Sequence, residues 1–230
     1  MLFGIEWDTS SNLAFAISIF PILMLGLWVT VQATVVGFAI AIVLGLVLAA
    51  LKSAPTKLIS WPAYAITEFI RDTPLLIQLF FLYYVLHEFG LVLPAFLTGA
   101  LALGIQYSAY LSEVYRAGIE AVAKGQHEAS RALNLAGART FSHIVLPQAI
   151  PRIIPAMGNY LVSIMKDVPI LSVVTVLELL NVATIIGDRT FNYLVPLSMV
   201  GGIYLALTLV ASALVRLIDK NLPKRGLPLK

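Results

Sequence analysis

The chain has 230 residues, of which 60% are hydrophobic and 12% are charged, with no cysteine and a mean hydropathy of +0.92. This composition excludes an ordinary soluble domain and is typical of integral membrane proteins, and the lack of cysteine excludes a disulfide framework or a thiolate metal site. The first residues include Glu6 and Asp8 but no Lys or Arg, the reverse of a signal peptide's basic start, so we expect the first hydrophobic segment to be retained.

Apolar stretches long enough to cross a bilayer follow one another along the chain. A crossing needs roughly 20 apolar residues, so the length leaves room for about five spans and no sizeable soluble domain. We predict an all-α, polytopic bundle that forms a single transmembrane domain over residues 1–230. The predicted spans are, in order, residues 20–51, 58–87, 94–116, 154–180 and 194–217.

The second predicted span contains charged residues and a proline. Glu68, Arg71 and Asp72 precede Thr73-Pro74. Because proline disfavours helix at the residue before it, we expect a kink at Asp72–Pro74, followed by PLLIQLFFLYYVL as the deeply buried half of the span.

The fourth predicted span begins and breaks at prolines. Pro147, Pro151 and Pro155 punctuate the return of the chain to the membrane, and Lys166–Pro169 interrupts the span. The Gly187–Thr190 segment that follows is expected to be a loop. Lipid tolerates irregular backbone only where protein or water satisfies its polar groups, so these breaks fit either a solute path or a braced interior.

The basic residues indicate the orientation of the bundle. With the N-terminus outside, the inner segments are Lys52–Lys57, Arg116–Arg152 and the tail from Arg216, and they hold 12 of the 15 Lys and Arg residues. This bias follows the positive-inside rule. We therefore expect a cytoplasmic C-terminus and a cytoplasmic loop over residues 118–149, and we interpret the pI of about 9.2 as a topology signal rather than a sign of nucleic-acid binding.

Two predicted spans carry polar side chains along one helix face. The first set is Gln106, Tyr110 and Glu113, and the second is Asn159, Ser163 and Lys166. A charge at the bilayer centre costs roughly 2.5–3.5 kcal/mol, so such residues normally face the protein interior or a water-filled path. These six are candidates for a solute pathway. The alternative is that they brace the bundle, in pairs such as Glu68 with Arg71 and Glu113 with Arg116.

The loop over residues 118–149 is the longest polar run in the chain. Its Gln126–Leu133 segment consists of good helix formers, and Asn134 and Gly137 can end that helix because both tolerate a left-handed cap. Pro147 marks a second boundary. Such a short helix either projects from the membrane or lies on its surface as an amphipathic connector, and periodicity alone does not separate the two.

This segment resembles the EAA loop of ABC-importer permease subunits. Glu128-Ala129-Ser130 is followed after three residues by Asn134 and after nine more by Ile144-Val-Leu146-Pro147, which is the family spacing. Ser130 stands where the family has its second Ala, and Asn134 where it has Gly. Neither change puts coupling seriously in doubt, because Ser is small and Asn also accepts a left-handed cap.

Two further stretches resemble the polar amino acid branch of that family. They are Glu68–Leu76, in which Asp72 replaces the usual Gly, and Ala109–Ile119. Leu133-Asn134-Leu135, together with the run LGIQYSAYLSEVYRAGIE, is similar to permeases for ectoine and hydroxyectoine.

The resemblance implies a multi-pass permease subunit of a bacterial inner (plasma) membrane importer that carries a polar amino acid or an amino-acid-derived compatible solute such as ectoine. The chain has no GxxxxGK[ST] phosphate loop, so ATP is expected to be bound by a separate cytoplasmic ATPase dimer, and no cofactor is expected here. The other expected partners are a second permease subunit, identical or related, a periplasmic substrate-binding protein and membrane lipid.

The resemblance also implies which residues couple the chain to the ATPase. They are Gln126, His127, Glu128, Ala129, Ser130, Arg131, Leu133 and Asn134. Glu128 is expected to pair with a basic ATPase residue, while Ala129 and Ser130 allow close approach.

A secondary transporter and an enzyme are the two alternatives to the importer. An ion-gradient-driven secondary transporter would leave the EAA-like spacing unexplained, and such transporters usually contain inverted repeats, which we do not detect. An enzyme is not expected, because His87, His127 and His143 share no helix face and the carboxylates lack metal-ligand spacing. No catalytic or metal-binding residue is therefore predicted.

Overall fold

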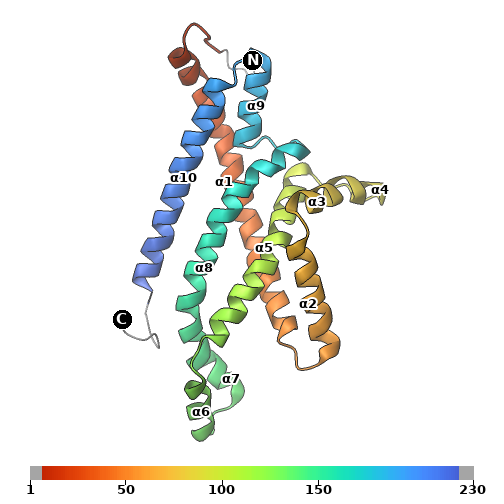
Figure 1. Ribbon diagram of the computed structural model, residues 1–230, viewed down its shortest axis with the longest axis vertical. Helices are drawn as coiled ribbons and strands as arrows, with labels where there is room; N and C mark the ends of the chain where they lie inside the picture. The colour runs from red at the N-terminus through yellow and green to blue at the C-terminus, as the bar shows by residue number, and fades with distance from the viewer. Residues whose placement is uncertain (1–6, 223–230) are drawn as a thin grey trace.

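The computed structural model describes residues 7–222, and within that range the chain is almost entirely helical and contains no β-strand. The all-α prediction is confirmed. The long helices run roughly along the long axis of the molecule, with α9 at one end and α6 and α7 at the other (Figure 1).

The elements are α1 (Asn12–Lys52), α2 (Lys57–Asp72), α3 (Leu75–Phe80), the π-helical η1 (Phe81–Val85), α4 (Leu86–Glu88), α5 (Ala95–Glu120), α6 (Lys124–Ala132), α7 (Gly137–Thr140), the π-helical η2 (Phe141–Val145), α8 (Leu146–Asp167), the 3₁₀-helical η3 (Val168–Val174), α9 (Leu179–Thr190) and α10 (Leu194–Asn221).

Within the described residues, α1 and α10 are each long and apolar enough to cross a membrane. Two bent pairs meet the same criterion only when each is taken as one span: α2 with α3–α4, and Gly137–Val174 with α9. The less apolar α5 is not in this set. More than half of its 26 residues are buried inside the protein, so few of its side chains need to suit lipid. The five-span arrangement stays a prediction.

Helix α1 packs closely along α5 through small residues. Those on α1 recur every fourth position and therefore share one face: Gly37, Ala41 and Gly45. A Cβ atom on Gly45 would lie 3.0 Å from Leu111 Cβ, and one on Gly104 of α5 would lie 2.4 Å from Ile40 Cγ2. Lipid chains are as apolar as the side chains of the helices, so burying those side chains gives no hydrophobic gain. Helices in lipid therefore associate through close packing of this kind.

The expected break in the second span is confirmed, but its consequence differs from the prediction. The α2 helix ends at Asp72, Thr73 is extended before Pro74, and the chain turns by 102° into α3–α4. The expectation that PLLIQLFFLYYVL is deeply buried is wrong, because Leu79 alone in this stretch is fully buried. The turn carries α3 and α4 away from the bundle (Figure 1), so their outer faces lose contact with the other helices.

The prolines of the fourth span interrupt it less than expected. Helix continues from α7 through the π-helical η2 into α8, with Pro147 in the first turn of α8 and Pro151 and Pro155 inside it. Pro147 is the second residue of α8, directly after the π turn, and proline is best tolerated in the first turn of a helix. The predicted interruption at Lys166–Pro169 is confirmed, because α8 ends at Asp167 and a 3₁₀ helix follows.

The expectation that Gly187–Thr190 is a loop is wrong, because these residues form the last turn of α9. The α9 helix begins with the Glu178 carboxylate as its N-cap, accepting hydrogen bonds from the Leu180 and Asn181 amides (2.9 and 2.7 Å). Gly187 lies against the Tyr193 ring, where a Cβ would approach Cδ1 to 2.5 Å. The glycine therefore lets the Tyr193 ring, just before α10, pack closely on α9, and it does not form a turn.

We expect Gly104→Ala to lower the thermal unfolding midpoint of the detergent-solubilised chain. The new methyl would also lie 2.6 Å from Ile40 Cβ, an atom that no rotamer change can move, and such overpacking costs about 1–3 kcal/mol. Gly201→Ala in α10 is the control, because its methyl meets nothing within 4 Å; its midpoint should stay equal or rise. Equal midpoints for the two variants would contradict the α1–α5 packing argument.

Candidate functional site

The polar segment between α5 and α8 contains a short helix with a defined end. The α6 helix spans Lys124–Ala132, close to the predicted Gln126–Leu133. Asn134 has a left-handed backbone (φ 53°), and the Asn134 and Leu135 amides donate to the Arg131 and Ser130 carbonyls (2.9 and 3.0 Å). This is the Schellman pattern. Asn134 thus ends the helix as predicted, whereas Gly137 does not, because it is the first residue of α7.

The coupling residues predicted from the sequence fall on two sides of α6. Ser130 is buried, its hydroxyl donating to the Gln126 carbonyl (2.6 Å), and His127 and Arg131 line a hollow together with residues of α7 and η2. Glu128 and Ala129 are exposed and do not line this hollow, while His127 and Arg131 are exposed at its rim. The expectation that Ser130 lies at the approach surface is therefore wrong. A small residue is needed there because this side of α6 packs against the chain itself.

The remaining coupling candidates are accessible from outside. Gln126, Leu133 and Asn134 are exposed, and Leu133 retains 72% of its accessible surface. The face of α6 that carries Glu128 and Ala129 is therefore open to a partner.

A second polar group lies midway along α5, where it faces the break between α2 and α3. Gln78 of α3 donates from Nε2 to Gln106 Oε1 (2.6 Å) and to the Ile70 and Thr73 carbonyls (2.8 and 3.2 Å). Gln106 in turn donates to the Tyr110 hydroxyl (3.3 Å). Gln78 thus satisfies carbonyl groups at the end of α2, which a broken helix in a membrane requires.

Three tyrosine rings continue this group toward α8. The Tyr110 ring stacks on that of Tyr160 with centroids 5.7 Å apart, and Tyr107 packs at 5.9 and 6.1 Å from the two. The Tyr107 hydroxyl donates to Asp167 Oδ2 (2.7 Å), and the Arg71 guanidinium lies 5.9 Å from the Tyr110 ring centroid. We call these seven residues the tyrosine cluster: Arg71, Gln78, Gln106, Tyr107, Tyr110, Tyr160 and Asp167.

Two polar atoms of the tyrosine cluster are buried without a hydrogen-bond partner in the described chain, Arg71 Nε and Gln78 Oε1. Such atoms are uncommon in folded proteins and each needs an explanation. A polar solute or water reaching the cluster would supply the missing partners.

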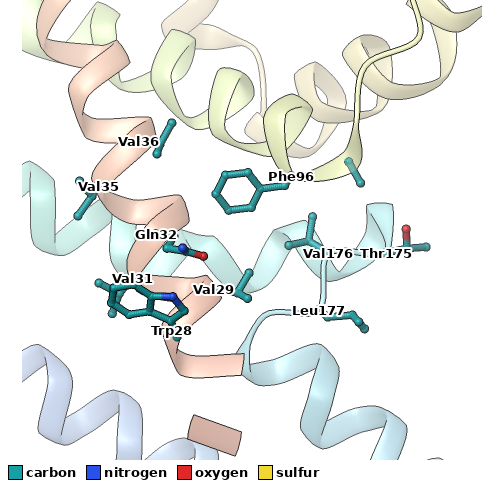
Figure 2. A pocket seen from close by; sticks show the side chains of 11 residues that line it. Trp28, Val29, Val31, Gln32, Val35, Val36, Phe96, Thr175, Val176 and Leu177 are labelled. Atoms are coloured by element: carbon teal, nitrogen blue, oxygen red, sulfur yellow. The ribbon is translucent and has the colours of Figure 1, made fainter. Parts of the chain in front are cut away.

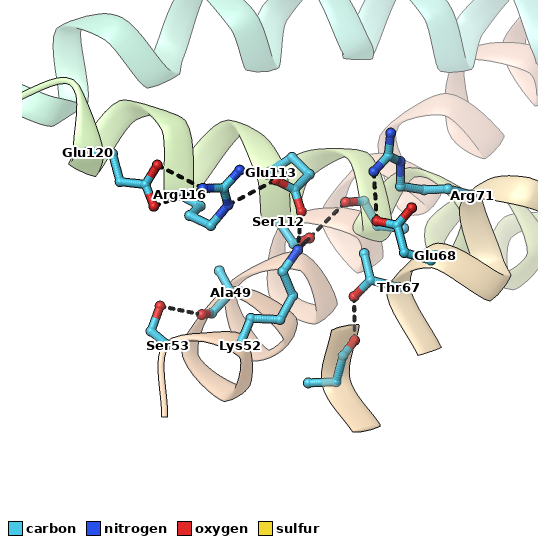
Figure 3. Close-up of polar contacts among 12 residues, drawn as sticks. Ala49, Lys52, Ser53, Thr67, Glu68, Arg71, Ser112, Glu113, Arg116 and Glu120 are labelled. Carbon is cyan, nitrogen blue, oxygen red and sulfur yellow. Dashed lines mark hydrogen bonds and ion pairs between the residues drawn. The ribbon is translucent and has the colours of Figure 1, made fainter. Parts of the chain in front are cut away.

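The predicted pathway residues do not all meet. Gln106 and Tyr110 belong to the tyrosine cluster, whereas Glu113 pairs with Lys52 and Arg116 nearer to the end of α5 (Figure 3). The second set lies on an open side of α8: Asn159 and Lys166 are exposed, and the Ser163 hydroxyl donates to the Asn159 carbonyl of its own helix (3.1 Å). One stripe on a helix has thus been divided between two environments.

Sequence reasoning did not name five members of the tyrosine cluster as pathway residues. Arg71 and Asp167 lie at the two predicted helix interruptions, so a charge beside a break was the available signal. Tyr107 and Tyr160 carry no such signal, because an aromatic residue in a span is most often a packing residue.

The groove in Figure 2 is separate from this cluster. It lies between α1, the start of α5 and the segment before α9, with Trp28, Val35, Phe96 and Val176 among its walls. Gln32 projects into it, but none of the predicted pathway residues lines it. Its mainly apolar walls suit lipid or another helix rather than a polar solute.

Comparison with known proteins gives a single answer over most of the chain. Residues 41–224 match the family described as binding-protein-dependent transport system inner membrane component. The chain is 68% identical, over the full length of both, to a probable amino-acid ABC transporter permease protein, y4tG, of Sinorhizobium fredii. It is 36% identical to the probable glutamine ABC transporter permease protein GlnM of Bacillus subtilis, over 93% of this chain and 99% of the relative.

A solved structure agrees with these relatives. The crystal structure of an amino acid ABC transporter with histidines matches with a TM-score of 0.88 and 37% identity, over 94% of this chain and 100% of that chain.

We expect Asn134→Val to loosen the end of α6, because a left-handed backbone costs a residue other than Gly or Asn roughly 1–2 kcal/mol. Hydrogen exchange at the Leu135 amide, which bonds to the Ser130 carbonyl, should become about tenfold faster. Asn134→Gly should preserve its protection. Ala136→Val is the control, since Ala136 is extended with φ −60°, and should leave exchange unchanged; an equal effect of both valines would refute the capping role.

Proposed function

Because this chain belongs to the family of binding-protein-dependent transport system inner membrane components, we propose that α6 receives the drive of a cytoplasmic ATPase and that the tyrosine cluster lies on the solute path. The chain is a permease subunit of an amino-acid ABC importer in the inner membrane and is not an enzyme. This membership sets aside the ion-gradient-driven secondary transporter.

The exposed face of α6 carries the proposal for the ATPase contact. Glu128 presents a carboxylate and Ala129 a small surface on the side of the helix that the rest of the chain leaves open. A groove on the ATPase with a basic residue at its rim would complement both. Permease subunits of ABC importers work with a cytoplasmic ATPase and a substrate-binding protein. We propose that the ATPase binds this exposed face of α6.

The arrangement of the basic segments supports a cytoplasmic position for α6. The turn between α1 and α2, the α6–α7 segment and the C-terminal end of α10 all point toward one end of the bundle, while the start of α1 and α9 lie at the other (Figure 1). These three segments are the inner ones predicted by the positive-inside rule. We propose accordingly that the N-terminal end of α1 faces the periplasm, where the substrate-binding protein would dock.

The tyrosine cluster offers complementary groups to a zwitterionic solute. Arg71 supplies a cation beside the Tyr110 ring, Asp167 supplies a carboxylate beside Tyr107, and the glutamine amides supply donors and acceptors. Broken helices flank it, and such backbone is stable in a membrane only against protein or a water-filled cavity. We propose that Gln106 and Tyr110 line the path. Asn159, Ser163 and Lys166 are proposed to face the path from α8 or to face the second permease subunit. Glu113 is proposed to brace the bundle.

The solute class is proposed from the same chemistry. The names of the relatives given above carry the words amino acid and glutamine, which favours a polar α-amino acid. The narrower ectoine prediction rests on Leu133-Asn134-Leu135 and the sequence run around Tyr110, and it has no support among those names. It is kept as the alternative that uptake measurements decide.

We expect Glu128→Arg to abolish capture of the ATPase. The detergent-solubilised chain would be used to pull down the ATPases of its host, and reversal of a charge at the interface should lower the captured amount at least tenfold, or about 1.4 kcal/mol. Glu88→Arg is the control, because Glu88 is an exposed acid at the end of α4. If neither the wild type nor the control captures an ATPase, α6 is a surface connector and the proposed contact is wrong.

We expect Tyr110→Leu to raise the KM for solute uptake about tenfold, since it removes a hydroxyl that the Gln106 amide bonds and a ring that Tyr160 and Arg71 contact. Uptake of labelled L-glutamine, other polar L-amino acids and ectoine would be compared in proteoliposomes. Tyr84→Leu, at an exposed tyrosine of η1, should leave the KM unchanged. Uptake of ectoine alone would overturn the amino-acid assignment, and an unchanged KM for Tyr110→Leu would remove the cluster from the path.

A further inference from the structure

A line of alternating charges runs along the inner end of the bundle (Figure 3). Lys52, the last residue of α1, forms an ion pair with Glu113 of α5 and lies 3.2 Å from the Ser112 hydroxyl. Glu113 also accepts from Arg116 Nε and Nη2 (3.0 and 2.8 Å), and Arg116 Nη1 binds both carboxylate oxygens of Glu120 (2.8 and 2.7 Å). The line therefore joins the end of α1 to the last residue of α5.

The same lysine also reaches α2. Its ammonium lies 5.1 Å from the centroid of the Tyr64 ring, a distance at which a cation is attracted to an aromatic face. Lys52 thus contacts α5 and α2 while it belongs to α1, and its position in the last turn of α1 places the cation at the negative end of that helix dipole. One side chain connects three helices.

The other end of the line leads directly to α6. Only three residues separate Glu120 from Lys124, and the middle one, Val122, is buried. Arg152 of α8 donates to the Ala121 carbonyl in this connection. The start of α6 is therefore attached to α5 and α8, and through the charge line to α1 and α2.

Burial distinguishes the two halves of the line. The Lys52 side chain is 0% exposed and that of Glu113 is 27% exposed, whereas Arg116 and Glu120 retain 36% and 62%. Exposed ion pairs contribute little to stability. A buried pair often stabilises a fold no better than apolar residues would, although it holds its partners in one defined geometry. The arrangement is therefore better suited to fixing relative position than to adding stability.

We infer that Lys52 and Glu113 are positioning residues for coupling, which make the inner ends of α1, α2 and α5 move as one body with α6. The inference rests on the proposed contact between α6 and the ATPase. When the ATPase displaces α6, the charge line carries the displacement to α2, whose opposite end meets the tyrosine cluster at Arg71. Without the line, α6 would move while α2 stayed behind.

Lys52→Met is the variant that tests this inference. It removes the cation from α1 but leaves Glu113 paired with Arg116, so no carboxylate is left without a partner. Lys52→Arg keeps the charge and should rescue. Lys57→Met changes an exposed lysine at the start of α2 and is the matched control.

Spin labels can report the motion directly, because the natural chain has no cysteine to remove. Cysteines would replace Leu58 of α2, which is 88% exposed, and the exposed Ala132 of α6, and the distance would be measured by pulsed electron resonance in the complex with the ATPase. In the wild type, Lys52→Arg and Lys57→Met, the distance should stay the same when ATP is added. In Lys52→Met it should change; an unchanged distance would overturn the inference.

Solute moved per ATP hydrolysed gives the functional result in proteoliposomes. Lys52→Met should lower this ratio at least fivefold while it retains ATPase capture and basal hydrolysis, a separation that simple loss of stability would not produce. An unchanged ratio would overturn the inference. Should Lys52→Met not assemble, Glu120→Gln at the exposed end of the line should lower the ratio at least twofold, and no change there would also overturn it.

The two proposals fail in different ways. If the wild-type chain captures no ATPase, the proposed function of α6 is wrong. If the wild type captures it and Lys52→Met couples as the wild type does, the contact stands and only the charge line loses its role.

Discussion

The close approach of α1 and α5 is the constraint on which the rest of the structure depends. Inside a membrane no hydrophobic force favours one apolar contact over another, so two helices stay together only if their surfaces fit. Gly37 and Gly45 on α1 and Gly104 on α5 remove the side chains that would hold them apart. With α5 enclosed in this way, α2 and α8 pack against it and bring their broken ends to its polar middle.

Enclosure of α5 also explains how polar residues are tolerated along it. The hydroxyls of Ser108 and Ser112 donate to carbonyls of their own helix (2.6 and 2.7 Å), so they add no unsatisfied group to the contact with α1. Larger polar side chains are satisfied across helices instead, Gln106 by Gln78 and Glu113 by Lys52. One helix thus carries the tyrosine cluster at its middle and the ion network near its C-terminal end.

The candidate sites differ in how far the sequence predicted them. The α6 helix could be predicted almost to the residue, because its signals are local: helix formers, a left-handed Asn134 and a spacing shared with a family. Which residues of α6 are buried could not be predicted, because Ser130 is covered by parts of the chain that are not its helical neighbours. For the polar stripes, helical spacing placed Gln106, Tyr110 and Glu113 on one face but said nothing of what each would meet.

The sequence by itself determined the all-α membrane bundle, the breaks at Pro74 and Pro169, and the short helix α6, because hydropathy, proline chemistry and capping act over a few neighbouring residues. The tertiary structure alone decided that Glu113 pairs with Lys52 rather than joining the tyrosine cluster. It also decided that Asp167 meets Tyr107 and that α3–α4 leaves the bundle. These outcomes depend on how helices far apart in the chain cross one another, and that is set by side-chain shapes on both surfaces at once.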